Sequence, residues 1–224
     1  MCRRSGMLFA AAIAALLFST STAAQVQDFS VIEPSPGYLK VTSGEIIARL
    51  RLGACEPGYE DACAQGAQLQ RSEYLPSASH SHGETVTYRW EIFVPNDFVY
   101  ETLSGDLRAG RFYNDSGEAI LSFLLDGTSG LTVNRKTCFG PEGFGQWHQV
   151  EVKAVWDSTK KKGLKDKTPG AISISCDGVE VHSSSGRPTV GEGKSVWLAL
   201  GLRGAMRLAD GDNATAHFRN LEYR

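Results

Sequence analysis

Apolar and polar residues alternate in runs that recur about every ten to fifteen residues along this chain. The clearest runs cover residues 44–52, 84–94, 118–126, 147–156 and 195–203. A period of two places successive side chains on opposite faces, which is the pattern of a β-strand with one buried face. Helical periodicity is scarce after the first 24 residues. The alternation therefore predicts a protein built mainly from β-sheets.

The strand-like runs also predict how the sheets are arranged. In residues 171–183, AISISCDGVEVHS, two alternating runs flank Asp177-Gly178, a pair that suits the positive φ angles of a type I′ hairpin turn. Residues 214–224 alternate around Phe218 and predict a closing strand. About a dozen strands with long connections fit two antiparallel sheets packed face to face, and we expect an all-β, concanavalin A-like jelly-roll β-sandwich.

The first 24 residues have the pattern of a secretory signal peptide. Arg3 and Arg4 precede an apolar run at residues 7–18, and small residues follow up to Ala24. The apolar run is too short to span a bilayer. We expect cleavage before Gln25, a secreted or periplasmic protein with no membrane insertion after signal removal, and one jelly-roll domain over residues 25–224.

Net charge bears on the class of partner. Removing residues 1–24 takes away two arginines and no acidic residue, which leaves 21 basic and 25 acidic residues, a net charge of −4. No global positive field exists to hold phosphates, so we expect no nucleic-acid partner. A local positive run at residues 160–167 is either a solvated loop or a contact for a polyanion.

Four cysteines remain in the mature chain, an even number for an oxidising compartment. Of the three possible pairings, we favour Cys55 with Cys63 and Cys138 with Cys176. On the chain-entropy model these disulfides contribute roughly 2.5 and 4 kcal/mol to stability. A zinc site is the weaker interpretation because no CxxC spacing is present, and no metal is expected.

Two short strands each place an arginine next to a second side chain that could act in chemistry, a glutamate in one strand and a tyrosine in the other. In LQRSEYLPS, Arg71 and Glu73 share one face by the period of two, and in GRFYND, Arg111 and Tyr113 do the same. Each pair has a simple alternative interpretation. The first could be an exposed ion pair worth about 0.2–1 kcal/mol, and the second an ordinary strand pair on a wet surface.

An ordered set of motifs gives a more specific indication. QRSEY, a strand ending in FVP, GQWHQVEVKAVW, GAISISCDGVEVHSSSGRPT and a Trp-containing strand ending in GLRG follow one another over residues 69–204. This order resembles the secreted polysaccharide lyases of the heparin-lyase-I-like and alginate-lyase-like jelly-roll families. In those families an R-x-E strand lies on the floor of a concave cleft, and its arginine faces the carboxylate of an acidic sugar.

The resemblance implies roles for individual residues. Arg71 and Glu73 match the R-x-E motif. Arg111 and Tyr113 stand where the family has the glutamine and histidine of Q-x-H. In a further strand Trp197 matches the aromatic residue of the family, whereas Ala199 and Arg203 stand where the family has a lysine and the tyrosine that exchanges protons.

The histidines are weaker candidates. His80 and His82 lie in a Ser-rich loop just after the R-x-E strand, where they could contact substrate or could simply be solvated. We interpret His148 as part of a framework strand rather than as a base. Trp197 suits stacking on a sugar ring beside Arg203, although a core position is equally compatible with its pattern.

The resemblance implies cleavage of an acidic, uronate-containing polysaccharide by β-elimination. Arg71 and Arg111 would neutralise the uronate, Tyr113 would move the proton, and Glu73 would hold the arginine in place. This mechanism requires no cofactor, and a monomer is expected. The main alternative is a non-catalytic glycan-binding protein that keeps the fold without the full catalytic set. A third class, a structural envelope protein that uses the sandwich for adhesion, is also compatible with the pattern.

Overall fold

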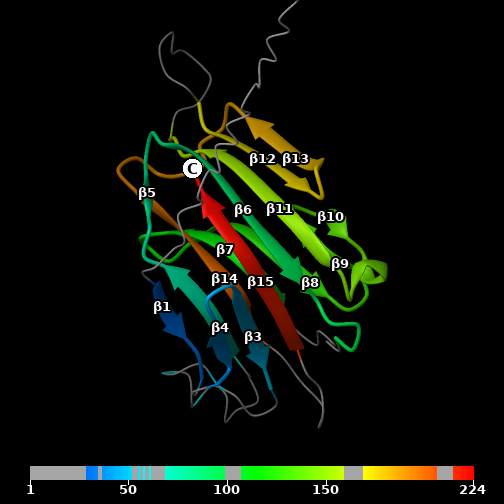
Figure 1. Cartoon of the computed structure of the whole chain (residues 1–224). Coiled ribbons are helices and arrows are strands. Elements are labelled where there is room, and N and C mark those ends of the chain that lie inside the picture. Colours follow the sequence, from blue (N-terminus) through cyan, green and yellow to red (C-terminus); the bar gives the residue numbers. More distant parts are fainter. Residues whose placement is uncertain are drawn as a thin grey trace, which may run out of the picture.

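The structure, a computed structural model, describes residues 29–34, 37–51, 55, 58, 61, 69–98, 107–158, 169–205 and 214–224. Two antiparallel sheets pack face to face, which confirms the predicted jelly-roll β-sandwich (Figure 1). The expected signal peptide (1–24) and the lysine run of residues 160–167 lie outside the described residues. Within the described part of the chain, no helix has the length and apolar character needed to cross a membrane.

Sheet A contains the strands that carry Arg71, Glu73, Arg111 and Tyr113, and its central strands come from distant parts of the chain. In spatial order it consists of β1 (Phe29–Ile32), β4 (Leu69–Pro76), β14 (Ser195–Ala205), β7 (Leu107–Asn114), β8 (Ala119–Asp126), β9 (Gly130–Val133) and β10 (Lys136–Phe139), with the short β5 (His80–Ser81) paired to β14.

Sheet B covers the other side of the core. Its order is β13 (Val179–Ser185), β12 (Ala171–Cys176), β11 (Trp147–Val155), β6 (Thr85–Phe93), β15 (Ala214–Tyr223), β3 (Glu45–Leu50) and β2 (Leu39–Val41). The β12–β13 hairpin turns at Asp177 and Gly178, whose φ angles are +50° and +79°. This turn was predicted from the sequence. Every alternating run that was predicted to be a strand is a strand in the structure.

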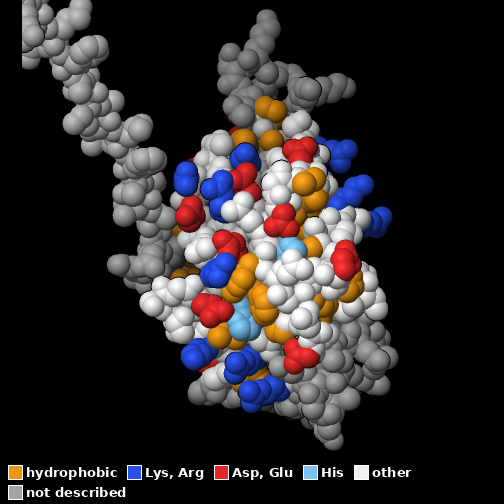
Figure 2. All heavy atoms as spheres, turned by 45° about the vertical axis from the view of Figure 1, so that its right-hand side comes forward, with side chains coloured by type: hydrophobic (Ala, Val, Ile, Leu, Met, Phe, Trp, Pro, Cys, Tyr) orange, Lys and Arg blue, Asp and Glu red, His pale blue; other side chains and the backbone are white. Residues whose placement is uncertain are grey.

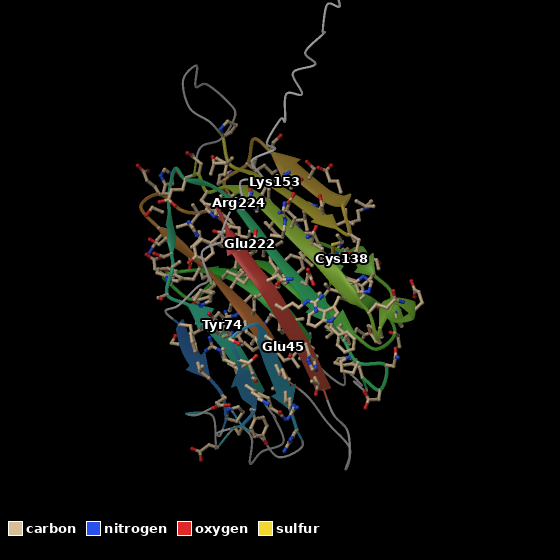
Figure 3. All side chains as sticks on the ribbon, viewed as in Figure 1. Glu45, Tyr74, Cys138, Lys153, Glu222 and Arg224 are labelled. Carbon is tan, nitrogen blue, oxygen red and sulfur yellow. A yellow bond between two sulfur atoms is a disulfide. The ribbon has the colours of Figure 1, made fainter. Side chains whose placement is uncertain are left out.

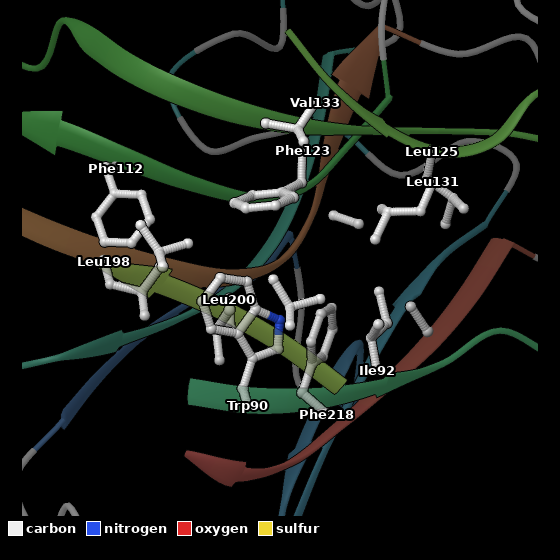
Figure 4. Packing of buried hydrophobic residues seen from close by; sticks show 14 of the residues in the cluster. Trp90, Ile92, Phe112, Phe123, Leu125, Leu131, Val133, Leu198, Leu200 and Phe218 are labelled. Carbon is white, nitrogen blue, oxygen red and sulfur yellow. The ribbon is translucent and has the colours of Figure 1, made fainter. Parts of the chain in front are cut away.

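Aromatic side chains from both sheets fill the space between them. Along β6 every second residue is buried, as the period of two requires. Trp90 of sheet B packs edge-on against Phe123 of sheet A, with ring centroids 5.2 Å apart. Figure 4 shows Trp90, Phe112, Phe123 and Phe218 converging in this layer, and each is almost fully buried. One face of each central strand of sheet A is buried in this core, so only the opposite face could contact a ligand.

One disulfide joins the two sheets. Cys138 on β10 is bonded to Cys176 on β12, which confirms the favoured pairing of these two residues. Cys55 is also disulfide-bonded, and Cys63, its expected partner, lies outside the described residues. The Cys138–Cys176 bond joins the edge strand β10 of sheet A to β12, the second strand of sheet B, and β10 lies at the end of sheet A farther from β4.

Candidate functional site

Arg71 and Glu73 lie on the outward face of sheet A, next to the C-terminal half of β14. In the β4–β14 register, Arg71 is opposite Arg203 and Glu73 is opposite Gly201. The alternate residues of β14 point into the core and are almost completely buried: Val196, Leu198, Leu200 and Leu202. The R-x-E pair and Arg203 therefore share one surface.

The second pair reaches the same surface from β7. On the other side of β14, Arg111 is opposite Ala199 and Tyr113 is opposite Trp197. The central strand β14 thus lies between the two pairs. Arginine, glutamate and aromatic side chains that are distant in sequence meet on the outward face of β4, β14 and β7, which we call the arginine face.

Glu73 is the centre of an ion cluster. Arg111 Nε donates to Glu73 Oε1 at 2.9 Å, Arg111 Nη2 reaches Oε2 at 3.3 Å, and Arg71 Nε donates to Oε2. Glu73 is 1% exposed and Arg111 is 4% exposed, so the pair is shielded from water. One carboxylate against two guanidinium groups leaves a net positive charge, and this arrangement is unlike a solvated surface pair.

Two small residues of β14 allow this cluster to form across a strand. Arg111 and Glu73 come from strands on either side of β14, and Ala199 and Gly201 are the outward-facing residues between them. Ala199 is completely buried although it faces outward. At Gly201, φ is +141° and an added Cβ would lie 2.2 Å from the Ser72 carbonyl oxygen. Larger side chains at these positions would separate the two halves of the cluster.

The inner face of β4 is held by hydrogen bonds rather than by apolar packing alone. Ser72 Oγ donates to the Tyr38 carbonyl oxygen at 2.8 Å and accepts from the Arg49 amide at 3.4 Å. Gln70 Oε1 accepts from the Arg51 amide at 3.2 Å. These bonds run to the β2–β3 side of sheet B, so they fix the position of β4 and of the charged side chains on its outer face.

Tyr113 lies between a cation and an aromatic ring. The Arg111 guanidinium carbon is 4.7 Å from the centre of the Tyr113 ring, and the Trp197 ring is stacked at 6.0 Å with an interplanar angle of 22°. Burial raises the pKa of the Tyr113 phenol above its ordinary value, and the lowering by Arg111 does not offset this. Burial therefore outweighs the effect of the cation on the pKa of Tyr113, and the phenol is neutral at pH 7.

Arg108 reaches the arginine face as well, and the sequence analysis missed it. It lies opposite Arg203 of β14 and opposite Leu124 of β8. Relative to β8, the strand β7 carries one extra residue at Ala109, so the alternation shifts between Arg108 and Arg111. A strict period of two would have put these two arginines on opposite faces. A bulge of this kind leaves no clear sequence signal in LRAGRFYN.

The structure does not bring His80 or His82 to the arginine face. The His80 ring packs edge-on against Tyr88 and Tyr223, with centroids 5.2 and 5.5 Å away, inside the edge of the sandwich. His82 Nε2 lies 2.9 Å from Ser158 Oγ. Both rings therefore tie chain segments together at positions separate from the Glu73 cluster.

His148 has the framework position that its strand predicted. Its ring stacks on Phe139 with a centroid distance of 3.9 Å. Nδ1 lies 2.7 Å from Asp177 Oδ2, and Nε2 lies 2.8 Å from the Gly143 carbonyl oxygen. Both nitrogens are engaged by groups of the protein itself, on sheet B and the adjoining turns.

The outward face of sheet B offers a contrasting surface. A hollow of about 200 Å³ is lined by Thr87, Arg89, Glu151, Lys153, Glu222 and Arg224, and Figure 3 shows the last two and Lys153 close together. Each carboxylate here is paired with a cation: Glu151 contacts Arg89 and lies 3.0 Å from Lys153 Nζ, and Arg224 Nη2 donates to Glu222 at 3.2 Å. Figure 2 shows the same interspersed signs over the face that it presents.

The arginine face has the chemistry to bind an anion. Guanidinium groups match carboxylates in both charge and geometry, and an aromatic ring beside them suits the C–H surface of a sugar. Among the described residues, no group of three or more His, Cys, Asp or Glu side chains is placed to hold a metal ion.

No protein-family model and no curated protein sequence matches the chain. Among solved structures, an alginate lyase from Corynebacterium sp. has a TM-score of 0.62 at 12% identity, with 89% of this chain and 94% of that chain covered. An endo-β-1,4-glucuronan lyase from the fungus Trichoderma reesei has a TM-score of 0.58 at 14% identity, with 92% and 91% covered. A sialidase has a TM-score of 0.55 at 13% identity, with 92% of this chain but 18% of that chain covered. The chain therefore has the jelly-roll fold of these lyases.

Proposed function

We propose that this protein, which has a polysaccharide lyase-like fold, acts on an acidic, uronate-containing polysaccharide at the arginine face and cleaves it by β-elimination. The observation that carries the proposal is the ion cluster of Arg71, Glu73 and Arg111 beside Tyr113 and Trp197. The solved lyases with this fold act on alginate and glucuronan, as their names state.

The first chemical requirement is charge neutralisation. A uronate carboxylate makes the neighbouring C5 proton difficult to remove, because a second negative charge would develop next to the first. Arg71 and Arg111 supply positive charge from fixed positions, since Glu73 holds both of them. Preorganised cations of this kind stabilise the developing charge without having to reorient during the reaction.

The second requirement is proton transfer. In β-elimination a base takes the C5 proton, the electron pair forms the C4–C5 double bond, and the bond from C4 to the glycosidic oxygen breaks as that oxygen is protonated. We assign both transfers to Tyr113, as phenolate for the first and as phenol for the second. Since burial raises the pKa of Tyr113, the phenolate is the scarce form at pH 7.

Trp197 and Arg203 would hold the neighbouring sugars. Trp197 stacks on Tyr113 at the same face, and Arg203 lies opposite Arg71. No cofactor is needed in this scheme. We further propose that the protein works outside the cytoplasm as a monomer, and the Cys138–Cys176 disulfide supports an oxidising compartment.

A second function is favoured by the composition of β14. Ala199 and Arg203 stand where the lyase motif has its lysine and its proton-exchanging tyrosine, and Ala199 is completely buried opposite Arg111. A non-catalytic glycan-binding protein would use the same arginines and Trp197 without any proton transfer.

Turnover and binding assays separate the two functions. The protein is incubated with alginate, glucuronan and heparin-like chains while the ultraviolet absorbance of the unsaturated product is followed. A lyase gives a rising signal, which Tyr113→Phe abolishes while binding is retained. Tyr223→Phe, on the opposite sheet, is the matched control and keeps the activity. Binding without any absorbance change selects the glycan-binding function, and activity that survives in Tyr113→Phe shows that another group carries the proton.

A further inference from the structure

We propose that Gln70 and Ser72 are positioning residues for the candidate site: they anchor β4 to sheet B, so that the charged outer face of β4 stays in register with the groups on β7. The inference rests on the proposed function of the arginine face. The R-x-E motif leaves the residue between its arginine and its glutamate unspecified, and here that residue is Ser72.

Buried polar side chains are concentrated on β4. In the described part of the chain seven polar or charged residues are buried, and three of them, Gln70, Ser72 and Glu73, belong to this one strand. Gln70 and Ser72 are completely buried and share the inner face of β4 by the period of two. The neighbouring strand β14 presents only apolar residues to the core: Val196, Leu198, Leu200 and Leu202. Since burying a polar side chain is unfavourable unless it is hydrogen-bonded, the partners of these two residues explain their presence.

Both side chains bind the backbone of the opposite sheet. Ser72 Oγ donates to the Tyr38 carbonyl oxygen at 2.8 Å and accepts from the Arg49 amide at 3.4 Å. The Arg49 amide also donates to the Tyr38 carbonyl oxygen at 2.8 Å, so the Ser72 hydroxyl joins an existing backbone bond. Gln70 Oε1 accepts from the Arg51 amide at 3.2 Å. Two points on β4, two residues apart, are therefore fixed to the β2–β3 side of sheet B.

The backbone of β4 is fixed from the side of β14 as well. The Ser72 carbonyl oxygen would lie 2.2 Å from a Cβ at Gly201, where φ is +141°. Glycine permits this close approach because it has no side chain and tolerates that backbone conformation. Ser72 is thus held in two directions, through its hydroxyl and through its carbonyl group. The positions of Arg71 and Glu73, its neighbours in the chain, follow from this.

Directional bonds locate a strand more precisely than apolar packing does. The hydrophobic effect is non-directional, whereas a hydrogen bond is restricted in both distance and angle. Functional groups have to be held within about 0.5 Å of the productive geometry. Glu73 needs this precision because it reaches Arg111 across the width of β14, and Arg111 in turn contacts the ring of Tyr113.

The Gln70 side chain has a cost that favours a positioning role over a purely structural one. Its Nε2 is buried and has no hydrogen-bond partner in the structure. An unsatisfied buried donor destabilises a fold. Native proteins that break such a rule do so mainly at functional sites. The Gln70 side chain is therefore better explained by its placement of β4 than by a gain in stability.

The kinetic test compares Ser72→Ala, Ser72→Thr and a core control, Leu125→Ala, on alginate or glucuronan, whichever wild type cleaves. Leu125 lies on the inner face of β8 and is 1% exposed. Ser72→Ala should lower kcat about tenfold and change KM less than about threefold, since misplaced groups lose transition-state stabilisation. Ser72→Thr keeps the hydroxyl and should retain kcat within about threefold of wild type. Leu125→Ala should melt at a lower temperature and keep the kcat of wild type.

Gln70→Met separates positioning from stability and also serves if Ser72→Ala does not fold. The substitution removes the unpaired Nε2 and leaves the Arg51 amide unpaired instead, so the melting temperature should stay close to that of wild type. Because β4 loses one of its two anchors, kcat should nevertheless fall by about threefold or more. A Gln70→Met variant that melts at a lower temperature and keeps full kcat would show that Gln70 only stabilises the fold.

A readout without turnover keeps this inference separate from the function on which it rests. The Nε protons of Arg71 and Arg111 donate to Glu73, and their exchange with water can be followed by NMR. Ser72→Ala should speed this exchange, whereas Leu125→Ala should leave it unchanged at temperatures where the variant is folded. If wild type neither cleaves nor binds uronate chains but Ser72→Ala speeds the exchange, the proposed function is wrong and the anchoring stands. If Ser72→Ala matches Leu125→Ala in both exchange and kcat, the positioning role is wrong while the function stands.

Discussion

Glu73 determines where the cations of the arginine face point. Its two carboxylate oxygens are engaged by Arg71 and Arg111, and with 1% of its surface exposed it has almost no contact with water. Here a single carboxylate orients two guanidinium groups from different strands, which makes it a positioning residue for the proposed anion site.

The first prediction concerns Glu73→Gln. Removing this charge leaves two closely spaced guanidinium groups without their counter-charge, and losing one partner of a buried ion pair costs about 3–5 kcal/mol. The free energy of unfolding, measured with denaturant, should fall by about that amount. Glu192→Gln, an exposed glutamate after β13, is the control and should stay within about 0.5 kcal/mol of wild type. A Glu73→Gln variant as stable as this control would contradict the described cluster.

The second prediction concerns the pH dependence of any lyase activity. The base is the deprotonated form of Tyr113, and burial raises the pKa of this phenol above its ordinary value of about 10. The phenolate fraction therefore increases tenfold for each pH unit throughout the neutral range, and kcat/KM should keep rising up to at least pH 10. A profile that levels off below pH 8 would exclude Tyr113 as the base.

At the scale of elements, β14 organises the site because it lies between β4 and β7. Its inner residues belong to the core, while Ala199 and Gly201 leave room for the cluster above it. The close approach of β14 to β4 depends on Gly201, where φ is +141° and a Cβ would meet the backbone of Ser72 and Glu73.

The third prediction follows from that approach. Gly201→Ala should destabilise the fold by roughly 1–3 kcal/mol from backbone conformation alone, with a further loss from the collision with β4. Binding of acidic polysaccharide should weaken as well, because Glu73 moves with β4. Gly44→Ala is the control, since Gly44 has open space around it and no positive φ. Thermal unfolding and calorimetry of both variants provide the check, and equal behaviour of the two would show that the close approach is unimportant.

The same strands show how much of the fold and of the candidate site could be predicted from the sequence alone. Alternation predicted β4, β6, β8, β11 and β14 because each buries one face and leaves the other outward. It also placed Arg71 beside Glu73 and Arg111 beside Tyr113. Alternation carries no information on which strands are neighbours, so the β4–β14–β7 order was found only in the structure. Arg108 was missed because a bulge changes the period locally. His80 was named as a possible substrate contact but lies elsewhere, because a two-residue strand has too short a pattern to show which way it faces.

At the scale of the whole molecule, the two sheets are held by their shared core and by the Cys138–Cys176 bond. The bond joins β10 of sheet A to β12 of sheet B, and 38 residues separate the two cysteines. The arginine face lies on β4, β14 and β7, none of which carries either cysteine. Stability and binding should therefore be separable.

The fourth prediction uses this separation. Replacing both Cys138 and Cys176 by alanine should lower the free energy of unfolding by about 4 kcal/mol on the chain-entropy model. At temperatures where the variant is folded, its affinity for acidic polysaccharide should remain within about twofold of wild type, since no group on the arginine face changes. Unaltered stability would contradict the proposed contribution of the bond. A large loss of affinity in the folded variant would show that the two edges of sheet A are coupled.

The most direct measurement for the account as a whole is a crystal structure of Tyr113→Phe with a bound uronate hexasaccharide. We predict that the sugar chain crosses β4, β14 and β7 on the outward face of sheet A, with one carboxylate against Arg71 and Arg111 and a sugar ring against Trp197. An oligosaccharide bound instead to the outward face of sheet B, or no ordered sugar at a saturating concentration, would contradict the central claim.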